Sequence, residues 1–223
     1  MKRLIVFDVN ETLLDLSALD QEFEGVFGNS SSRGDWFAQV LQNSLVATIT
    51  GKYDDFGTIA GAALDMTAQR HKVELLQETR NAILRGIRSL PAHPDVKTGL
   101  NRLKDAGFRL FTLTNSPPQV VQAQLKNSGL FEYFERSLSV DAIKRFKPDT
   151  EVYKMTATEL GVPIEQVRLV AAHDWDVAGA LIAGCAAAFV ARAGKVLNPL
   201  MPVPDIVGKD LIAVAEKIIS TDT

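Results

Sequence analysis

A short apolar run that ends in a carboxylate, close to the N-terminus, most constrains the fold of this chain. Leu4 to Phe7 are all apolar and are followed directly by Asp8. A run of this length, rich in β-branched and aromatic side chains, predicts a strand buried on both faces and is too short for a buried helix. Ligands of open α/β sheets bind at the carboxyl ends of the strands, where Asp8 would lie. Asp8 is therefore a candidate nucleophile, metal ligand or structural cap.

The sequence after Pro94 alternates between helical and strand-like segments. Four further strands are expected at residues 108–114, 134–140, 167–172 and 185–191. Helices are expected at residues 96–106, 117–127, 149 or 150 to 160, 176–183 and 210–219. Strands separated by helices of this length predict a parallel sheet with right-handed crossovers. The expected fold class is α/β, with a Rossmann-like sheet core.

The segment from Asp15 to about Arg88 has helical patterns and no convincing strand. Asp35 is a plausible N-cap for a helix that runs through residue 46 and beyond, and residues 28–34 read as a flexible connection. Two more helices are expected at residues 56–70 and 74–87. We therefore expect a helical cap subdomain at residues 15–91, inserted into a core made of residues 1–14 and 92–223.

Composition narrows the ligand to a small molecule. The 223 residues include 24 Lys and Arg against 27 Asp and Glu, for a net charge of −3, without basic blocks. Nucleic acid and anionic membranes are therefore unlikely partners. The N-terminus lacks the pattern of a secretory signal and no apolar run has membrane-spanning length, so a cytoplasmic protein is expected. Cys185 is the single cysteine, which excludes an intrachain disulfide and a Cys-based zinc site.

Polar residues follow each expected strand, and the ends of parallel strands meet at one edge of a sheet. The residues expected there are Asp8, Asn10, Thr12, Thr114, Asn115, Ser116, Lys147, His173, Asp174, Trp175 and Asp176. Taken singly, most have an ordinary structural reading: a helix cap, a solvated loop or a structural histidine. Glu11 and Asp15 read as turn and helix-start residues. Together they predict a site built around Asp8.

In this combination the chain resembles the haloacid dehalogenase superfamily. Its four motifs are matched in order by Phe7–Leu13, Leu113–Ser116, Lys147–Pro148 and Ala171–Asp176. The resemblance is closest to the type II, (S)-2-haloacid enzymes, through Tyr153, the segment 175–180 and the cap segment 51–53. It implies a helical cap over a Rossmann-like core and a 2-halocarboxylate substrate, and a homodimer is possible.

The resemblance also implies roles for individual residues. Asp8 would displace halide from C2 with inversion, and water would then attack the carboxylate carbon of the resulting ester. Lys147 would keep Asp8 ionised, and Asp176, either alone or together with His173, would position or deprotonate the water. Orientation of Asp8 and binding of the substrate carboxylate would fall to Thr12, Thr114, Asn115 and backbone N–H groups near Ser116. Tyr153 and Trp175 would wall the pocket.

Two positions argue against metal-assisted phosphoryl transfer. A phosphatase of this superfamily needs an acid two residues after the nucleophile, where this chain has Asn10. It also needs a carboxylate ligand for Mg²⁺ at the position of Ala172. No metal and no other cofactor is therefore expected. The alternatives that remain are a Mg²⁺-dependent phosphatase of small molecules and a non-catalytic binding protein on the same fold.

One cap position departs from the family pattern. The better-known dehalogenases carry a halide-binding arginine where this chain has Phe37, with Gln39 nearby. Phe37 and Gln39 are therefore expected at the substrate. Halide stabilisation is expected from another side chain, the candidates being Trp36, Gln39, Asn43, His173 and Arg33.

Overall fold

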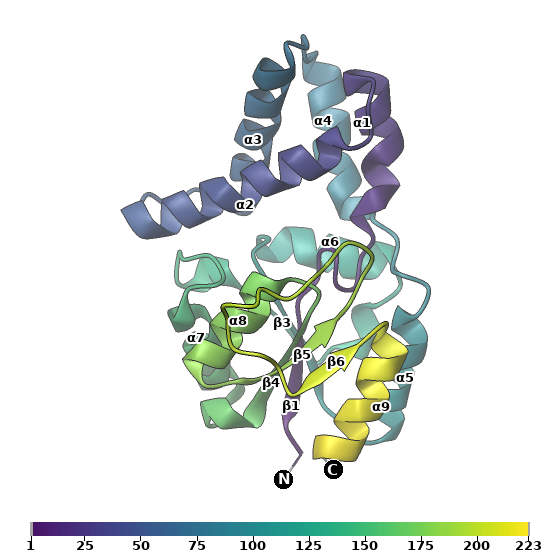
Figure 1. Ribbon diagram of the computed structural model, residues 1–223, viewed down its shortest axis with the longest axis vertical. Helices are drawn as coiled ribbons and strands as arrows, with labels where there is room; N and C mark the ends of the chain where they lie inside the picture. The colour runs from purple at the N-terminus through teal and green to yellow at the C-terminus, as the bar shows by residue number, and fades with distance from the viewer. Residues whose placement is uncertain (1, 223) are drawn as a thin grey trace.

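A parallel sheet forms the centre of the molecule. The computed structural model describes residues 2–222, and its six strands in this range are ordered β3-β2-β1-β4-β5-β6 (Figure 1). They are β1 (Leu4–Phe7), β2 (Leu110–Thr114), β3 (Arg136–Ser139), β4 (Val167–Ala171), β5 (Ala186–Val190) and β6 (Ile206–Gly208). All neighbouring strands run parallel. The expected α/β fold with a Rossmann-like sheet is confirmed.

The strand β1 lies in the middle of this sheet and is buried along its whole length. Phe7 is paired with Thr112 of β2 on one side and with Val170 of β4 on the other. The strand order therefore reverses at β1, which opens a crevice for ligands at its carboxyl end. Asp8, the next residue, lies at this point.

Helices cover both faces of the sheet. The core helices are α5 (Val96–Asp105), α6 (Pro118–Asn127), α7 (Thr150–Leu160), α8 (Asp174–Ala183) and α9 (Leu211–Asp222). Helices α5 and α9 pack against each other on one side of the sheet, and α7 and α8 do so on the other (Figure 1). Short 3-10 helices are η1 (Leu16–Leu19), η2 (Ile87–Ser89), η3 (Phe131–Tyr133), η4 (Val140–Ala142) and η5 (Ile164–Gln166). Within residues 2–222, no helix combines the length and the apolar character needed to cross a membrane.

Four helices between β1 and α5 form a separate group above the carboxyl edge of the sheet (Figure 1). They are α1 (Asp20–Phe27), α2 (Ser32–Thr50), α3 (Phe56–His71) and α4 (Gln77–Gly86). Leu14 and Ala92 form an isolated antiparallel bridge where the chain leaves the core and returns to it. We call this group of helices the cap.

Aromatic contacts join the far end of α2 to the core. The ring centroid of Phe146, the residue before Lys147, lies 5.0 Å from that of Tyr53 and 6.0 Å from that of Phe56. The backbone N–H of Phe146 donates to Thr48 Oγ1 at 3.0 Å. The cap is therefore packed directly against the loop that supplies Lys147.

The structure departs from the predicted elements at one strand and at the starts of two cap helices, one of which is α4, which begins at Gln77 and not at residue 74. Strand β6 was not predicted, because three residues with an exposed Val207 give too short an apolar pattern. Helix α2 begins at Ser32, three residues before the predicted cap Asp35. Gly34 lies in its first turn, and the preceding Arg33 pairs with Asp20 of α1.

Candidate active site

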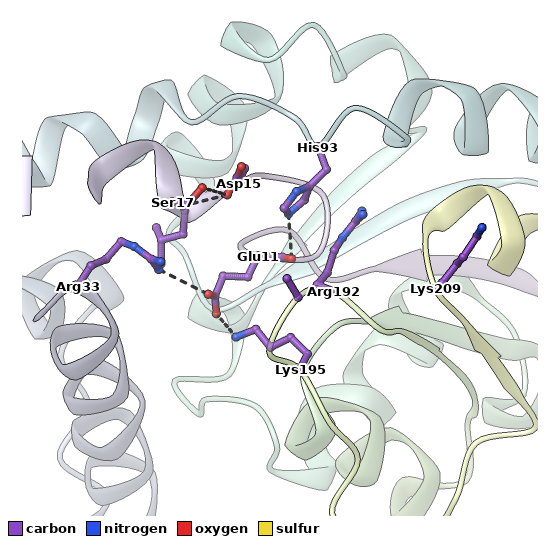
Figure 2. A pocket seen from close by; sticks show the side chains of 10 residues that line it. Glu11, Asp15, Ser17, Arg33, His93, Arg192, Lys195 and Lys209 are labelled. Carbon is purple, nitrogen blue, oxygen red and sulfur yellow. Dashed lines mark hydrogen bonds and ion pairs between the residues drawn. The ribbon is translucent and has the colours of Figure 1, made fainter. Parts of the chain in front are cut away.

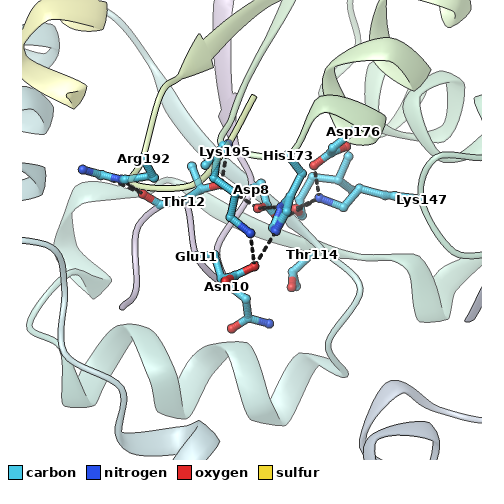
Figure 3. A network of polar contacts seen from close by, with 12 residues as sticks. Asp8, Asn10, Glu11, Thr12, Thr114, Lys147, His173, Asp176, Arg192 and Lys195 are labelled. Atoms are coloured by element: carbon cyan, nitrogen blue, oxygen red, sulfur yellow. Dashed lines mark hydrogen bonds and ion pairs between the residues drawn. The ribbon is translucent and has the colours of Figure 1, made fainter. Parts of the chain in front are cut away.

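Lys147 joins two carboxylates at the crevice. Its Nζ lies 2.8 Å from Asp8 Oδ1 and 2.6 Å from Asp176 Oδ2, and it donates to the carbonyl of Leu113 at 3.1 Å (Figure 3). These three contacts use all the N–H donors of the ammonium group. The three charged side chains are almost completely buried. The sequence-predicted residues Asp8, Lys147 and Asp176 are thus brought together in one cluster.

The second oxygen of Asp8 also has two partners. Thr12 Oγ1 donates to Asp8 Oδ2 at 2.6 Å, and the Nδ1 atom of His173 lies 3.2 Å from the same oxygen. The Thr12 hydroxyl in turn accepts the backbone N–H of Ala172 at 2.9 Å. Thr12 therefore ties the carboxylate that follows β1 to the end of the neighbouring strand β4.

The charges in this cluster set the protonation of Asp8 and His173. Burial alone would raise the pKa of Asp8, but the Lys147 ammonium and the His173 ring hold it well below its usual range. Burial would lower the pKa of His173, but Asp8 and Glu11 raise it to about 8. At neutral pH the site therefore holds an ionised aspartate beside a mostly protonated histidine.

Asp176 is the second carboxylate that Lys147 contacts. Its Oδ1 accepts the hydroxyl of Tyr153 at 2.6 Å, and its Oδ2 accepts Lys147. The side chain is completely buried, and burial raises its pKa. Both oxygens of Asp176 are thus occupied, and Tyr153, expected as a pocket wall, is used to hold Asp176 in place.

Glu11 is a member of the site that sequence reasoning missed. Its φ of 59° lies in the left-handed region. Its Oε2 lies 2.9 Å from His173 Nε2 and 2.6 Å from Lys195 Nζ (Figure 3). Burial would raise the pKa of Glu11, but His173 and Lys195 lower it to about 2. The sequence-based interpretation of Glu11 as a turn residue describes its backbone but not its carboxylate.

The segment after β2 is held by its own hydrogen bonds. Thr114 Oγ1 accepts the N–H of Ser116 at 3.1 Å, and Asn115 Oδ1 accepts the N–H of Lys147 at 3.0 Å. Ser116 Oγ accepts from Asn10 at 3.3 Å. Helix α6 begins at the second of two prolines, and proline has no backbone N–H. Fewer backbone N–H groups are therefore present at this helix start to bind the substrate carboxylate than the sequence analysis expected.

Two aromatic rings enclose His173. The ring centroid of Phe37, from the cap, lies 6.1 Å from that of His173, and that of Trp175 lies 4.8 Å from it on α8. Phe37 and Trp175 are thus beside the site, as expected. Gln39 is not joined to it by hydrogen bonds, because its amide pairs within the cap with Gln42, Asn43 and Arg70.

Of the expected halide-stabilising side chains, only His173 contacts Asp8. Trp36 Nε1 donates to the carbonyl of Ala60 inside the cap, and Asn43 pairs with Gln39 and Met66. Arg33 is anchored to Asp20 and comes no closer than 3.9 Å to Glu11.

The residues present do not fit a Mg²⁺ site. Neither Asn10 nor Ala172 carries a carboxylate, the hard oxygen ligand that Mg²⁺ prefers. The ammonium of Lys147 already bridges Asp8 and Asp176. Across residues 2–222, no three His, Cys, Asp or Glu side chains are grouped so that they could hold a metal.

The site thus belongs to an α/β protein with a buried carboxylate at the reversal point of its parallel sheet, beneath a helical cap. Comparison with known proteins places it more closely. Residues 2–184 match the model of the haloacid dehalogenase-like hydrolases, and the chain belongs to this family.

Several relatives carry a more specific name. The chain is 28% identical over 216 residues to the (S)-2-haloacid dehalogenase of Pseudomonas sp. strain YL, covering 95% of this chain and 92% of that one. It is 31% identical over 180 residues to (S)-2-haloacid dehalogenase 1 of Pseudomonas sp. strain CBS-3, covering 80% and 79%. The structure of the L-2-haloacid dehalogenase of Xanthobacter autotrophicus superposes with a TM-score of 0.92 at 25% identity, covering 99% and 100%.

Proposed function

We propose that the protein is a metal-independent hydrolytic dehalogenase that converts a short (S)-2-haloalkanoic acid to the 2-hydroxy acid. One observation carries this proposal: Asp8 is kept ionised by Lys147, whereas position 10 holds an asparagine. A halide leaves as a stable anion and needs no proton, so a nucleophile without a partner acid suffices. The names of the relatives support the same reaction.

In the first step, an oxygen of Asp8 attacks C2 of the substrate from the side opposite the halogen. The new C–O bond forms an ester on Asp8 while the carbon–halogen bond breaks and the halide leaves with its electron pair. Lys147 and Thr12 hold the carboxylate in place for this attack. Inversion at C2 follows from the direction of attack.

In the second step, water attacks the side-chain carbonyl carbon of Asp8, and His173 takes the proton. Asp176 is less suited to this role because Lys147 and Tyr153 occupy its oxygens. His173 faces Asp8 at 3.2 Å, and esterification removes the negative charge that stabilises its protonated form. On ester formation His173 therefore releases its Nδ1 proton to solvent, and the neutral ring is a base when water must be activated. The tetrahedral intermediate collapses with cleavage of the bond between this carbon and the ester oxygen, and His173 returns its proton to the leaving oxygen. The 2-hydroxy acid departs, and the new carboxyl group of Asp8 releases its proton to restore the carboxylate.

Two donors next to Asp8 are suited to the substrate carboxylate. The hydroxyl proton of Ser116 and the side-chain N–H groups of Asn115 have no hydrogen-bond partner among residues 2–222. We assign them to the substrate, whereas Thr114 acts through the turn that positions Ser116. Phe37 and Trp175 form the apolar walls on either side of His173.

The remaining expectations concern the cap and the assembly. We propose that residues 15–91 act as one cap that excludes water during ester formation.

We also propose a homodimer formed through the cap, because Leu45, Val46 and Ile49 of α2 are exposed apolar side chains. A cytoplasmic location is retained as an expectation of the sequence. Light scattering measures the oligomeric state directly.

The reaction is tested with a panel of (S)-2-chloropropionate, chloroacetate and phosphate monoesters, first in EDTA and then with added Mg²⁺. We expect halide release that EDTA leaves unchanged and that Asp8→Asn abolishes. Asp174→Asn is the matched control, since Asp174 lies next to the site but outside the Asp8 cluster. Mg²⁺-dependent phosphate release without halide release would refute the proposal.

The covalent route has its own test. Multiple turnovers in ¹⁸O-water should place ¹⁸O in the side chain of Asp8, where peptide mass spectrometry detects it. Turnover that never labels Asp8 excludes the aspartyl ester.

A further inference from the structure

A basic cleft opens between the cap and the core next to Glu11. It has a volume of about 420 Å³, and Glu11 and Asp15 lie along it (Figure 2). Its cationic lining consists of Arg33 from α2 and Arg192, Lys195 and Lys209 from the core. We call it the Lys195 cleft.

The cations of this cleft differ in how far they are already paired. The guanidinium of Arg192 is paired with Asp95, and it makes four contacts, to the carbonyl of Thr12 and to both oxygens of Asp95. Lys195 donates one of its three N–H groups to Glu11. Lys209 is exposed and has no hydrogen bond or ion pair within residues 2–222. Donors on Lys195 and Lys209 are therefore available to an anion in the cleft.

Two contacting side chains, Glu11 and His173, lie between this cleft and the carboxylate of Asp8. Glu11 Oε2 contacts Lys195 on the cleft side and His173 on the site side, and His173 contacts Asp8. Asp8 is only 4% exposed, so a substrate must pass surrounding groups to reach it. A small anion on Lys195 would lie two side chains from Asp8.

We propose that the Lys195 cleft captures small monocarboxylates, specifically the 2-halocarboxylate substrate, on Lys195 and Lys209 before they reach Asp8. This inference rests on the proposed function for the identity of the ligand. Cations around a cleft raise the local concentration of an anionic substrate, and salt screens the effect. The volume of the cleft accommodates a carboxylate of a few carbon atoms.

The kinetic test compares Lys209→Glu with Lys52→Glu. Both variants change the net charge equally, but Lys52 is exposed beyond the far end of α2 and does not line the cleft. With (S)-2-chloropropionate at low ionic strength, we expect Lys209→Glu to lower kcat/KM roughly three- to fivefold through KM. The loss should largely disappear in about 0.5 M salt, and Lys52→Glu should behave like the wild type. Equal kcat/KM for the two variants at low salt would overturn the proposal.

A binding test remains valid even if no halide is released. Propionate, which carries no halogen, is titrated into the wild-type protein while the backbone amide signals of Ala193 and Gly194 are followed by NMR. We expect these signals to shift, and to shift less in Lys209→Glu than in Lys52→Glu. Shifts without halide release would refute the proposed function but not the cleft. Halide release without these shifts would refute the cleft alone.

Discussion

Lys147 Nζ lies 2.8 Å from Asp8 Oδ1, although the two residues are 139 positions apart in the chain. The contact forms because Asp8 follows the central strand β1 while Lys147 precedes α7, and both reach the carboxyl edge of the sheet. A buried carboxylate without a cation would tend to take up a proton. The Lys147 contact therefore accounts for a nucleophile that stays ionised in a dry site.

Replacing Lys147 with methionine should remove activity by raising the pKa of Asp8. Without the ammonium, Asp8 and Asp176 are two buried carboxylates in the same cluster, and at least one of them binds a proton. We expect kcat for halide release to fall by about a hundredfold or more, and stability to fall by about 3–5 kcal/mol. Steady-state kinetics and urea unfolding measure these changes.

The double variant Lys147→Met, Asp176→Asn separates the loss of the ammonium group from the repulsion between the two carboxylates. Removing the second carboxylate also removes its repulsion, so we expect the double variant to be more stable than Lys147→Met alone. Equal or lower stability of the double variant would show that Asp176 is not destabilised by the loss of Lys147.

Replacing Asp8 with asparagine should lower the pKa of His173. Asp8 and Glu11 together raise the pKa of His173 to about 8, and the substitution removes one of these charges. It imitates the neutral ester, so it tests whether ester formation turns His173 into a base. NMR titration of the His173 ring in the wild type and in Asp8→Asn measures the change. A His173 pKa that is the same in both proteins argues against this role.

The sequence predicts the core of this molecule well because β1 and its neighbours are continuous apolar runs. It predicts Asp8, Lys147 and His173 because each follows a strand or belongs to a recognisable motif, and the structure brings these residues together. The family assignment rests on the same motifs and is confirmed. The catalytic roles of these residues stay predictions.

What the sequence does not predict depends on contacts between distant segments. Glu11 and Lys195 are 184 positions apart, and Lys195 belongs to no motif or periodic segment that would draw attention to it. Gln39 was expected at the substrate because it is near Phe37 in the sequence, but residues two positions apart on a helix do not face the same way. Its hydrogen bonds accordingly lie within the cap.

His173 should also make the stability of the protein depend on pH. Its folded pKa of about 8 exceeds the ordinary value of 6.5, so protonation favours the folded state. This contribution is fully present below pH 6.5 and is lost as the pH rises through about 8. Its size is about 2 kcal/mol.

Urea unfolding at several pH values between 6 and 9 measures this dependence. We expect His173→Gln to remove the decline in the free energy of unfolding over this range. His93→Gln is the control, because burial lowers the pKa of His93 and its contribution has the opposite sign. A decline that persists unchanged in His173→Gln would show that another group causes it.

A buried ion pair at the amino ends of the strands should contribute strongly to the free energy of unfolding, because it joins the C-terminal helix α9 to the sheet. Arg168 of β4 is completely buried, and its Nε lies 2.6 Å from Asp222 Oδ2 at the end of α9. Asp205 also contacts Arg168 at 2.6 Å, but the Asp205 side chain is 50% exposed whereas that of Asp222 is fully buried. Removing Asp222 leaves the buried guanidinium of Arg168 with the half-exposed Asp205 as its single carboxylate partner among residues 2–222, whereas removing Asp205 leaves the buried pair intact.

We therefore expect unequal effects from two matched substitutions around Arg168. Asp222→Asn should lower the free energy of unfolding by about 3 kcal/mol, and Asp205→Asn by about 1 kcal/mol or less. Halide release by the folded proteins should stay close to that of the wild type. Arg168 lies near the amino end of β4, whereas Asp8 follows the carboxyl end of the neighbouring strand β1. Urea unfolding and activity measured on the same samples test both statements. Equal destabilisation by the two substitutions would mean that burial of Asp222 does not determine the strength of this pair.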